Sequence, residues 1–237
     1  LKNLYWKELF NNLHKITSRL ASKQRAKILS ELQDNTSIDF TEQNIYAVVI
    51  WVIKNANKYY DQQLIELYKE LSSKENIKNY KSNKRTWEED KWRYSKEEKS
   101  HYCLDYRIIY SKWGSCFDYS RGETLSHSTT EFLSDIETVA HNLGFETDKE
   151  QYCNSGKFDI KNLANVKCHK NGNIHLKFNQ KFIKALNIEA ARLLGWIKEP
   201  RDTSDFPEDC KVTQEEAQQY FKVNFEMIGN VQQLLLN

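Results

Sequence analysis

The segment around Gly172 contains the first candidates for catalysis or binding. Asn171-Gly172, between two segments of alternating apolar residues, is the preferred dipeptide for a two-residue type I′ hairpin turn. If these two residues form the turn, Cys168 faces His175 and Lys167 faces Leu176 across the two strands. The sequence therefore predicts a β-hairpin here.

One face of this hairpin is expected to be polar. Side chains alternate along a strand, so His175 and Lys177 share a face with Cys168 and Lys170, opposite the apolar residues of the second strand, Ile174, Leu176 and Phe178. A histidine there could shuttle a proton, and a lysine could stabilise charge that builds on a phosphodiester. The alternative is that Lys170 to Asn173 only form the turn, while His175 packs against a neighbour.

A second candidate site surrounds a predicted helix start and comprises Arg107, Arg121, Glu123, His127 and Glu131. Ser128-Thr129-Thr130-Glu131 matches a capping box, and predicts a helix that Gly144 ends. His127 precedes this start, where helix-start amides together with Arg121 could hold a phosphate. The alternative is a plain cap and loop. Glu131 and Asp135 share one helix face, and we expect this pair to face solvent rather than to bind a metal.

A third candidate is the stretch 78–99, which holds eight Lys and Arg residues, five acids and interleaved aromatic residues. Aromatic rings can stack on unpaired bases while basic side chains follow the backbone. The alternative is a solvated insert whose tryptophans dock on the helical part. The predicted nucleic-acid-binding residues here and in the hairpin are Lys84, Arg85, Trp87, Trp92, Arg93, Lys170, Asn171 and Asn173.

Composition limits the function classes. The 237 residues carry 35 Lys and Arg against 33 Asp and Glu, a net charge of +2, so nucleic-acid binding would need a local basic surface. Aromatic residues make up 13%, which excludes wholesale disorder. No apolar run reaches the length of a membrane span. The five cysteines include no CxxC pair, so we expect reduced thiols in a cytoplasmic protein, with no metal and no cofactor.

The remaining patterns predict the helices and strands that carry these residues. Residues 1–34 are expected to be helical, and Thr41 is the predicted N-cap of a long helix that ends near Leu71. Residues 106–110 have strand composition, Asn179 is expected to cap a helix that Gly195 ends, and Thr213 with Glu216 forms a further capping box.

These elements predict an α+β protein, with an N-terminal helical hairpin or bundle followed by a small mixed α/β part around the Asn-Gly hairpin. The expected divisions are a helical part at 1–77, a charged aromatic insert or linker at 78–101, and the mixed part at 102–237.

Four short segments resemble a bacterial and phage family of unknown function, the domain-of-unknown-function family 4942. They are Tyr5-Trp6, residues 40–45, Leu133-Ser134-Asp135 and, above all, residues 169–178, and the likeness extends over most of 4–195. The resemblance implies an association with plasmids, phages and other mobile elements, and a DNA methyltransferase domain as a possible companion. The chain itself has no glycine-rich cofactor loop, so we do not expect methyltransferase activity.

The sequence therefore favours a nucleic-acid-interacting accessory protein of a mobile element, which binds DNA or RNA through a local basic surface. One alternative is a metal-independent nuclease that uses His175 and Lys177, with His127 or Arg121. The other is a protein-interaction module without catalysis.

Overall fold

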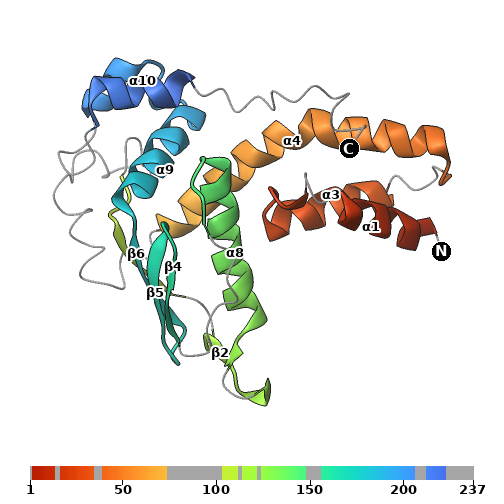
Figure 1. Ribbon diagram of the computed structural model, residues 1–237, viewed down its shortest axis with the longest axis horizontal. Helices are drawn as coiled ribbons and strands as arrows, with labels where there is room; N and C mark the ends of the chain where they lie inside the picture. The colour runs from red at the N-terminus through yellow and green to blue at the C-terminus, as the bar shows by residue number, and fades with distance from the viewer. Residues whose placement is uncertain are drawn as a thin grey trace.

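The computed structural model describes residues 2–13, 17–34, 39–73, 103–111, 114–121, 124–147, 156–205 and 212–222. The predicted insert at 78–99 lies outside these ranges, so Lys84, Arg85, Trp87, Trp92 and Arg93 have no structural description. Within the described ranges, helices come first and a four-stranded antiparallel sheet follows, which confirms the α+β prediction (Figure 1). None of the described helices combines the length and the apolar character of a membrane span.

The described helices are α1 (Lys2–Asn12), α3 (Ser22–Asp34), α4 (Glu42–Leu71), α8 (His127–Asn142), α9 (Gln180–Leu193) and α10 (Gln214–Lys222). The strands are β1 (Arg107–Ser111), β2 (Phe117–Asp118), β3 (Thr124–Leu125), β4 (Lys157–Ile160), β5 (Ala164–Cys168) and β6 (Asn173–Phe178). Two short 3-10 helices are η1 (Tyr119–Arg121) and η2 (Pro200–Asp205).

The N-terminal helical part is built against α4. Figure 1 shows α1 and α3 beside the first half of this long helix. Phe10, Ile28 and Val52 belong to one apolar cluster that joins these helices. The Thr41 side chain accepts a hydrogen bond from the Asn44 amide at 3.3 Å, which confirms the predicted N-cap of α4.

Residues 1–34 do not form one continuous helix, because α1 ends at Asn12 and α3 begins at Ser22. The start of α3 is held by side chains from other helices. Gln63 of α4 accepts from the Ala21 amide at 2.7 Å, and Asp135 of α8 accepts from the Ser22 amide at 2.8 Å. A helix start leaves amides without partners, and these contacts supply them.

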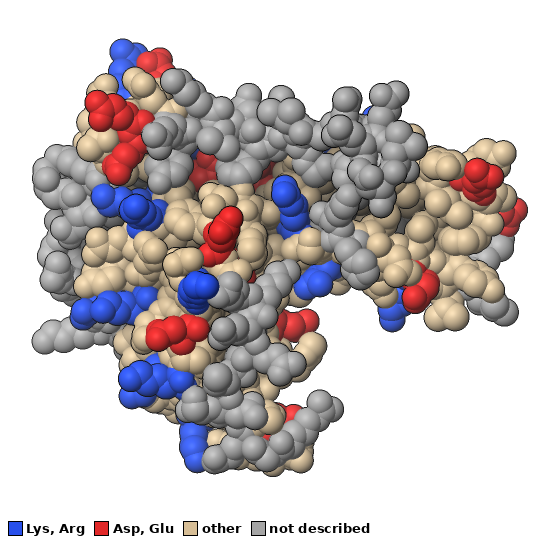
Figure 2. Space-filling model, viewed as in Figure 1, with Lys and Arg blue, Asp and Glu red and all other residues tan. Residues whose placement is uncertain are grey.

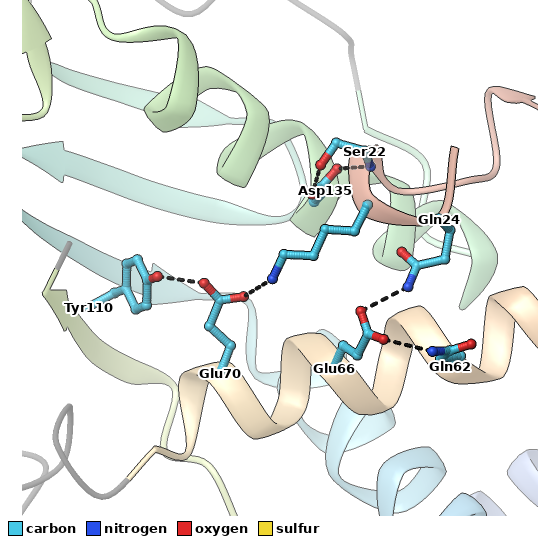
Figure 3. A network of polar contacts seen from close by, with 8 residues as sticks. Ser22, Gln24, Gln62, Glu66, Glu70, Tyr110 and Asp135 are labelled. Carbon is cyan, nitrogen blue, oxygen red and sulfur yellow. Dashed lines mark hydrogen bonds and ion pairs between the residues drawn. The ribbon is translucent and has the colours of Figure 1, made fainter. Parts of the chain in front are cut away.

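Asp135 is therefore not the solvent-facing residue that we expected. Its carboxylate also accepts from the Ser22 hydroxyl at 2.6 Å, as Figure 3 shows. The same close view shows Glu70 of α4 between two donors, the Tyr110 hydroxyl at 2.5 Å and the Lys23 ammonium at 3.8 Å. These polar contacts attach the helical part to the mixed part.

The mixed part is a sheet with strand order β1-β6-β5-β4. The described helices α8 and α9 and the end of α4 pack on one of its faces, where they form the main apolar core with Val166, Ile174 and Leu176 of the sheet. We call this the inner face and the opposite one the outer face.

The β5–β6 hairpin forms as predicted, but its register differs by one residue. The Gly172 amide donates to the His169 carbonyl at 3.1 Å, and the His169 amide donates to the Asn173 carbonyl at 2.9 Å. The loop is thus the three residues Lys170, Asn171 and Gly172. A type I′ turn needs positive φ at both central residues, but only Gly172 has it here, with φ +86°.

The shifted register changes which residues share a face. Lys167 lies opposite His175 and Cys168 lies opposite Ile174. Cys168 and Lys170 were predicted beside His175, and this was wrong: Cys168 is buried in the core at 6% exposure, and Lys170 belongs to the loop. The inward orientation of Ile174, Leu176 and Phe178 is confirmed, because all three are buried.

The predicted helix caps have mixed outcomes. The capping box at Ser128 is wrong, since α8 already begins at His127 with Ser126 as its N-cap. The Thr213 box is confirmed by reciprocal bonds, Glu216 amide to Thr213 hydroxyl at 3.2 Å and Thr213 amide to Glu216 carboxylate at 3.1 Å. Asn179 caps α9 by accepting from the Lys181 amide at 2.9 Å.

Candidate nucleic-acid interface

The outer face of the sheet presents two rows of side chains across the four strands. One row is Arg107, Lys177, Asn165 and Asp159, and the other is Ile109, His175, Lys167 and Lys157. All four cations in these rows are exposed. Asp159 is hydrogen-bonded to Asn165 beside it. Figure 2 shows Lys and Arg side chains spaced along the side of the molecule where Figure 1 draws β4 and β5.

The cations of this face lie opposite one another. Arg107 of β1 is in register with Lys177 of β6, and Lys167 of β5 is in register with Lys157 of β4. Like charges directly opposite across two strands destabilise a sheet. The arrangement therefore opposes the stability of the sheet, but it favours the approach of an anion.

Two histidines adjoin these cations. His169 and His175 lie diagonally across β5 and β6, with ring centroids 4.5 Å apart and an interplanar angle of 45°. The Nε2 atom of His169 is buried and has no hydrogen-bond partner. Burial first, and then the charges of His169 and Lys167, lower the pKa of His175 below its ordinary value of 6.5. This lowered pKa favours the neutral form of His175.

The loop end of the hairpin contacts two residues that flank β2, Cys116 and Tyr119. The Lys170 ammonium lies 5.7 Å from the centroid of the Tyr119 ring, which is 52% exposed. Asn171 accepts from the Asn173 amide at 3.2 Å, which stabilises the turn. The Asn173 carbonyl accepts a weak bond from the Cys116 thiol at 3.7 Å. Of the three predicted hairpin-tip residues, two therefore have structural roles, and Lys170 stays exposed.

The site predicted around the start of α8 is not assembled by the described contacts. The His127 side chain is 87% exposed and lies 3.4 Å from Glu131 along its own helix. Arg121 ends η1, and its side chain is not described. Within the described ranges, no group of three or more His, Cys, Asp or Glu residues could hold a metal ion.

Sequence reasoning missed three residues of the outer face: Lys157, Lys167 and His169. It assigned the fourth, Arg107, to the candidate site around the start of α8. Lys167 and His169 were assigned to the wrong side by the one-residue error in register. A three-residue loop with Gly172 in the left-handed conformation would have placed both correctly. Arg107 comes from β1, whose partner β6 lies far along the chain, so no local pattern predicts its register. Lys157 comes from β4, which pairs with β5 across the short loop 161–163, where Asn162 has a φ of +61°.

Comparisons with known proteins give one family assignment. No curated protein and no solved structure matches the chain significantly. The family model DUF4942, described as a domain of unknown function, matches residues 1–196, which include the helical part, the whole sheet and all of α8 and α9. The chain therefore belongs to the DUF4942 family, as the four resembling segments indicated.

Proposed function

We propose that this protein binds nucleic acid across the outer face of its four-stranded sheet, through contacts to phosphates. The observation that carries the proposal is the register of the cations, Arg107 opposite Lys177 and Lys167 opposite Lys157. Neighbouring strands lie about 4.8 Å apart, so a row across four strands extends over roughly 14 Å. A surface of this extent can contact several phosphates of one strand.

The charge balance supports a local interface. The whole chain has a net charge of only +2, but the two rows hold four exposed cations and one carboxylate, Asp159, which is bonded to Asn165. Phosphate contacts of this kind supply most of the affinity in binding that does not depend on base sequence. The interface therefore suits a protein that holds nucleic acid rather than one that reads its sequence.

The proposal includes a setting. A cytoplasmic accessory protein of a plasmid, phage or other mobile element would meet both DNA and RNA. The family resemblance suggests the mobile element, and the cysteines without a CxxC pair suggest the cytoplasm. A DNA methyltransferase domain or protein is a further proposed partner in that setting.

The first test is a titration of labelled single-stranded DNA, duplex DNA and RNA at two salt concentrations. The double variant Lys167→Ala/Lys177→Ala should bind more weakly, and the slope of log K against log salt for duplex DNA should fall by about 1.8, or 0.9 per lost phosphate contact. The matched control is Lys54→Ala/Lys58→Ala, which removes the same charge from exposed positions of α4.

Equal loss of affinity in both double variants would mean that only net charge matters, and would contradict the proposed interface. Binding that does not change with salt would also contradict it. If no nucleic acid binds to the wild-type protein, the proposal fails, and a protein partner becomes the function to test.

A further inference from the structure

His169 and His175 form a cluster with Lys167 that simple binding of phosphate does not require. Lys167 is the direct cross-strand neighbour of His175, and the two imidazoles are in ring contact at 4.5 Å between centroids. All three side chains lie on the outer face, beside Arg107 and Lys177 in the neighbouring row. The pair is thus placed within the proposed phosphate-binding surface.

Two imidazoles at this separation share protons unequally. Two adjacent imidazolium ions repel each other, so near neutral pH the pair holds a single proton more readily than two. Lys167 next to His175 adds a further charge that disfavours protonation of His175. The expected state of His175 is therefore neutral, so its imidazole can accept a proton.

The buried atom of His169 restricts the chemistry further. Its Nε2 is buried without a partner, so Nδ1 is the only nitrogen of this ring that a substrate could reach without ring rotation. A buried polar atom without a partner costs stability, and such atoms in folded proteins call for an explanation. Any contact of this ring with a substrate therefore has to use Nδ1.

We infer that His169 and His175, with Lys167, cleave bound RNA by attack of its own 2′-hydroxyl, without a metal ion. The inference rests on the proposed nucleic-acid binding. His175 removes the proton from the 2′-hydroxyl, and the 2′-oxygen forms a bond to phosphorus. The bond from phosphorus to the 5′-oxygen breaks, and protonated His169 gives its proton to that oxygen. Lys167 stabilises the charge on the non-bridging oxygens.

The step is balanced and needs no further reactant. One proton leaves the 2′-oxygen and one arrives at the 5′-oxygen, so the pair ends with the same number of protons, exchanged between the two rings. The products are a 2′,3′-cyclic phosphate and a 5′-hydroxyl. DNA lacks the attacking 2′-hydroxyl, so it is bound but stays intact.

A metal ion held between the two histidines fits the surroundings less well. The neighbouring charged residues of the described outer face are mainly cations, Lys167, Lys157, Lys177 and Arg107, and these repel a metal ion. The same charges attract a phosphodiester. The surroundings therefore favour an anionic substrate.

The test uses three oligonucleotides of one sequence: RNA, DNA with a single ribonucleotide, and fully 2′-O-methylated RNA. The full-length protein is in excess over each oligonucleotide, and EDTA is present to remove metal ions. We expect cleavage of the first two, only at ribonucleotides, with a 2′,3′-cyclic phosphate end. The third oligonucleotide should bind but stay intact. His175→Gln and His169→Gln should each slow cleavage by about 10²- to 10⁴-fold, and the rate of the wild-type protein should show a bell-shaped dependence on pH.

Controls separate this activity from a contaminant and from misfolding. The double variant His169→Gln/His175→Gln, purified in the same way, should bind 2′-O-methylated RNA and leave RNA intact. Lys54→Ala/Lys58→Ala should cleave at the wild-type rate. Each variant should keep the circular dichroism spectrum of the wild-type protein.

Three results would overturn the inference. If wild-type protein binds 2′-O-methylated RNA but leaves RNA intact, catalysis is excluded and the binding proposal stands. If the double histidine variant cuts RNA as fast as wild type, the cleavage comes from another source. If even 2′-O-methylated RNA is not bound, the binding proposal and the inference both fail.

Discussion

The two faces of the sheet are built from the same strands but differ in character, since the inner face is apolar and buried and the outer face is charged and exposed. On β6, Leu176 is 2% exposed and packs in the main core, while the next residue, Lys177, is exposed beside Arg107. The inner face gains stability from each apolar side chain, whereas the outer face places like charges together. The difference indicates that the outer residues are less constrained by the fold, and that their pattern has another cause.

The most direct test of this difference between the faces is to truncate two neighbouring residues of β6. Leu176→Ala should lower the free energy of unfolding by about 2–5 kcal/mol, because it removes buried methyl groups and leaves a cavity. Lys177→Ala should change it by no more than about 0.5 kcal/mol, since it removes only an exposed side chain and relieves repulsion from Arg107. Urea denaturation measures both. A large loss of stability in Lys177→Ala would contradict the claim that outer-face residues contribute little to the stability of the fold.

The comparison extends to carboxylates. Asp135 accepts two hydrogen bonds from Ser22, so Asp135→Ala leaves those donors without their partner and should cost about 1–3 kcal/mol. Asp159→Ala on the outer face removes an exposed bond to Asn165 and should cost less than about 0.5 kcal/mol. Equal costs in urea denaturation would show that the outer carboxylate also supports the fold.

The register of the hairpin decides which residues belong to which face, and Gly172 controls it. Its φ of +86° is unfavourable for a residue with a side chain, so Gly172→Ala should cost about 1–2 kcal/mol. Asn tolerates this conformation better, so Gly172→Asn should cost less. Thermal denaturation compares the two. If Ala and Asn behave alike, the left-handed turn does not set the register.

The smallest expected effect is a pH dependence at the outer face. The pKa of His175 is lowered in the folded state, so the unfolded chain binds more protons in the window below its ordinary value of 6.5. Stability from this group is complete above pH 6.5 and is lost as pH falls through the folded pKa. His175→Gln should therefore lose less stability than wild type between pH 7.5 and 5.5, as measured by urea denaturation. If wild type and His175→Gln show the same pH dependence, protonation of His175 does not lower the stability of the folded state.

Local patterns predicted the elements well. The Thr41 cap, the Asn179 cap and the Thr213 box depend on contacts within one turn, and the structure contains all three. The inward residues of β6 also follow from alternation alone. Sequence reasoning failed where a residue depends on a distant partner. Asp135 was expected to face solvent because its partner, Ser22, is in another helix.

The candidate site was only half predictable for the same reason. His175 and Lys177 were placed on the outer face correctly, since Ile174, Leu176 and Phe178 occupy the inner one. The face on which Lys167 and His169 lie depends on the type of loop, and an Asn-Gly dipeptide occurs in more than one loop type. The predicted sites in the 78–99 stretch stay predictions, because those residues lie outside the described ranges.

The pairing of β1 with β6 has a consequence for the order of folding. β5 and β6 are joined by a three-residue loop and can pair quickly, whereas β1 must wait for a strand that comes much later in the chain. Arg107 thus reaches Lys177 only after the β5–β6 hairpin exists. During synthesis on the ribosome, the row that contains both cations is completed only after β6 emerges, so the nascent chain gains its full charged surface late.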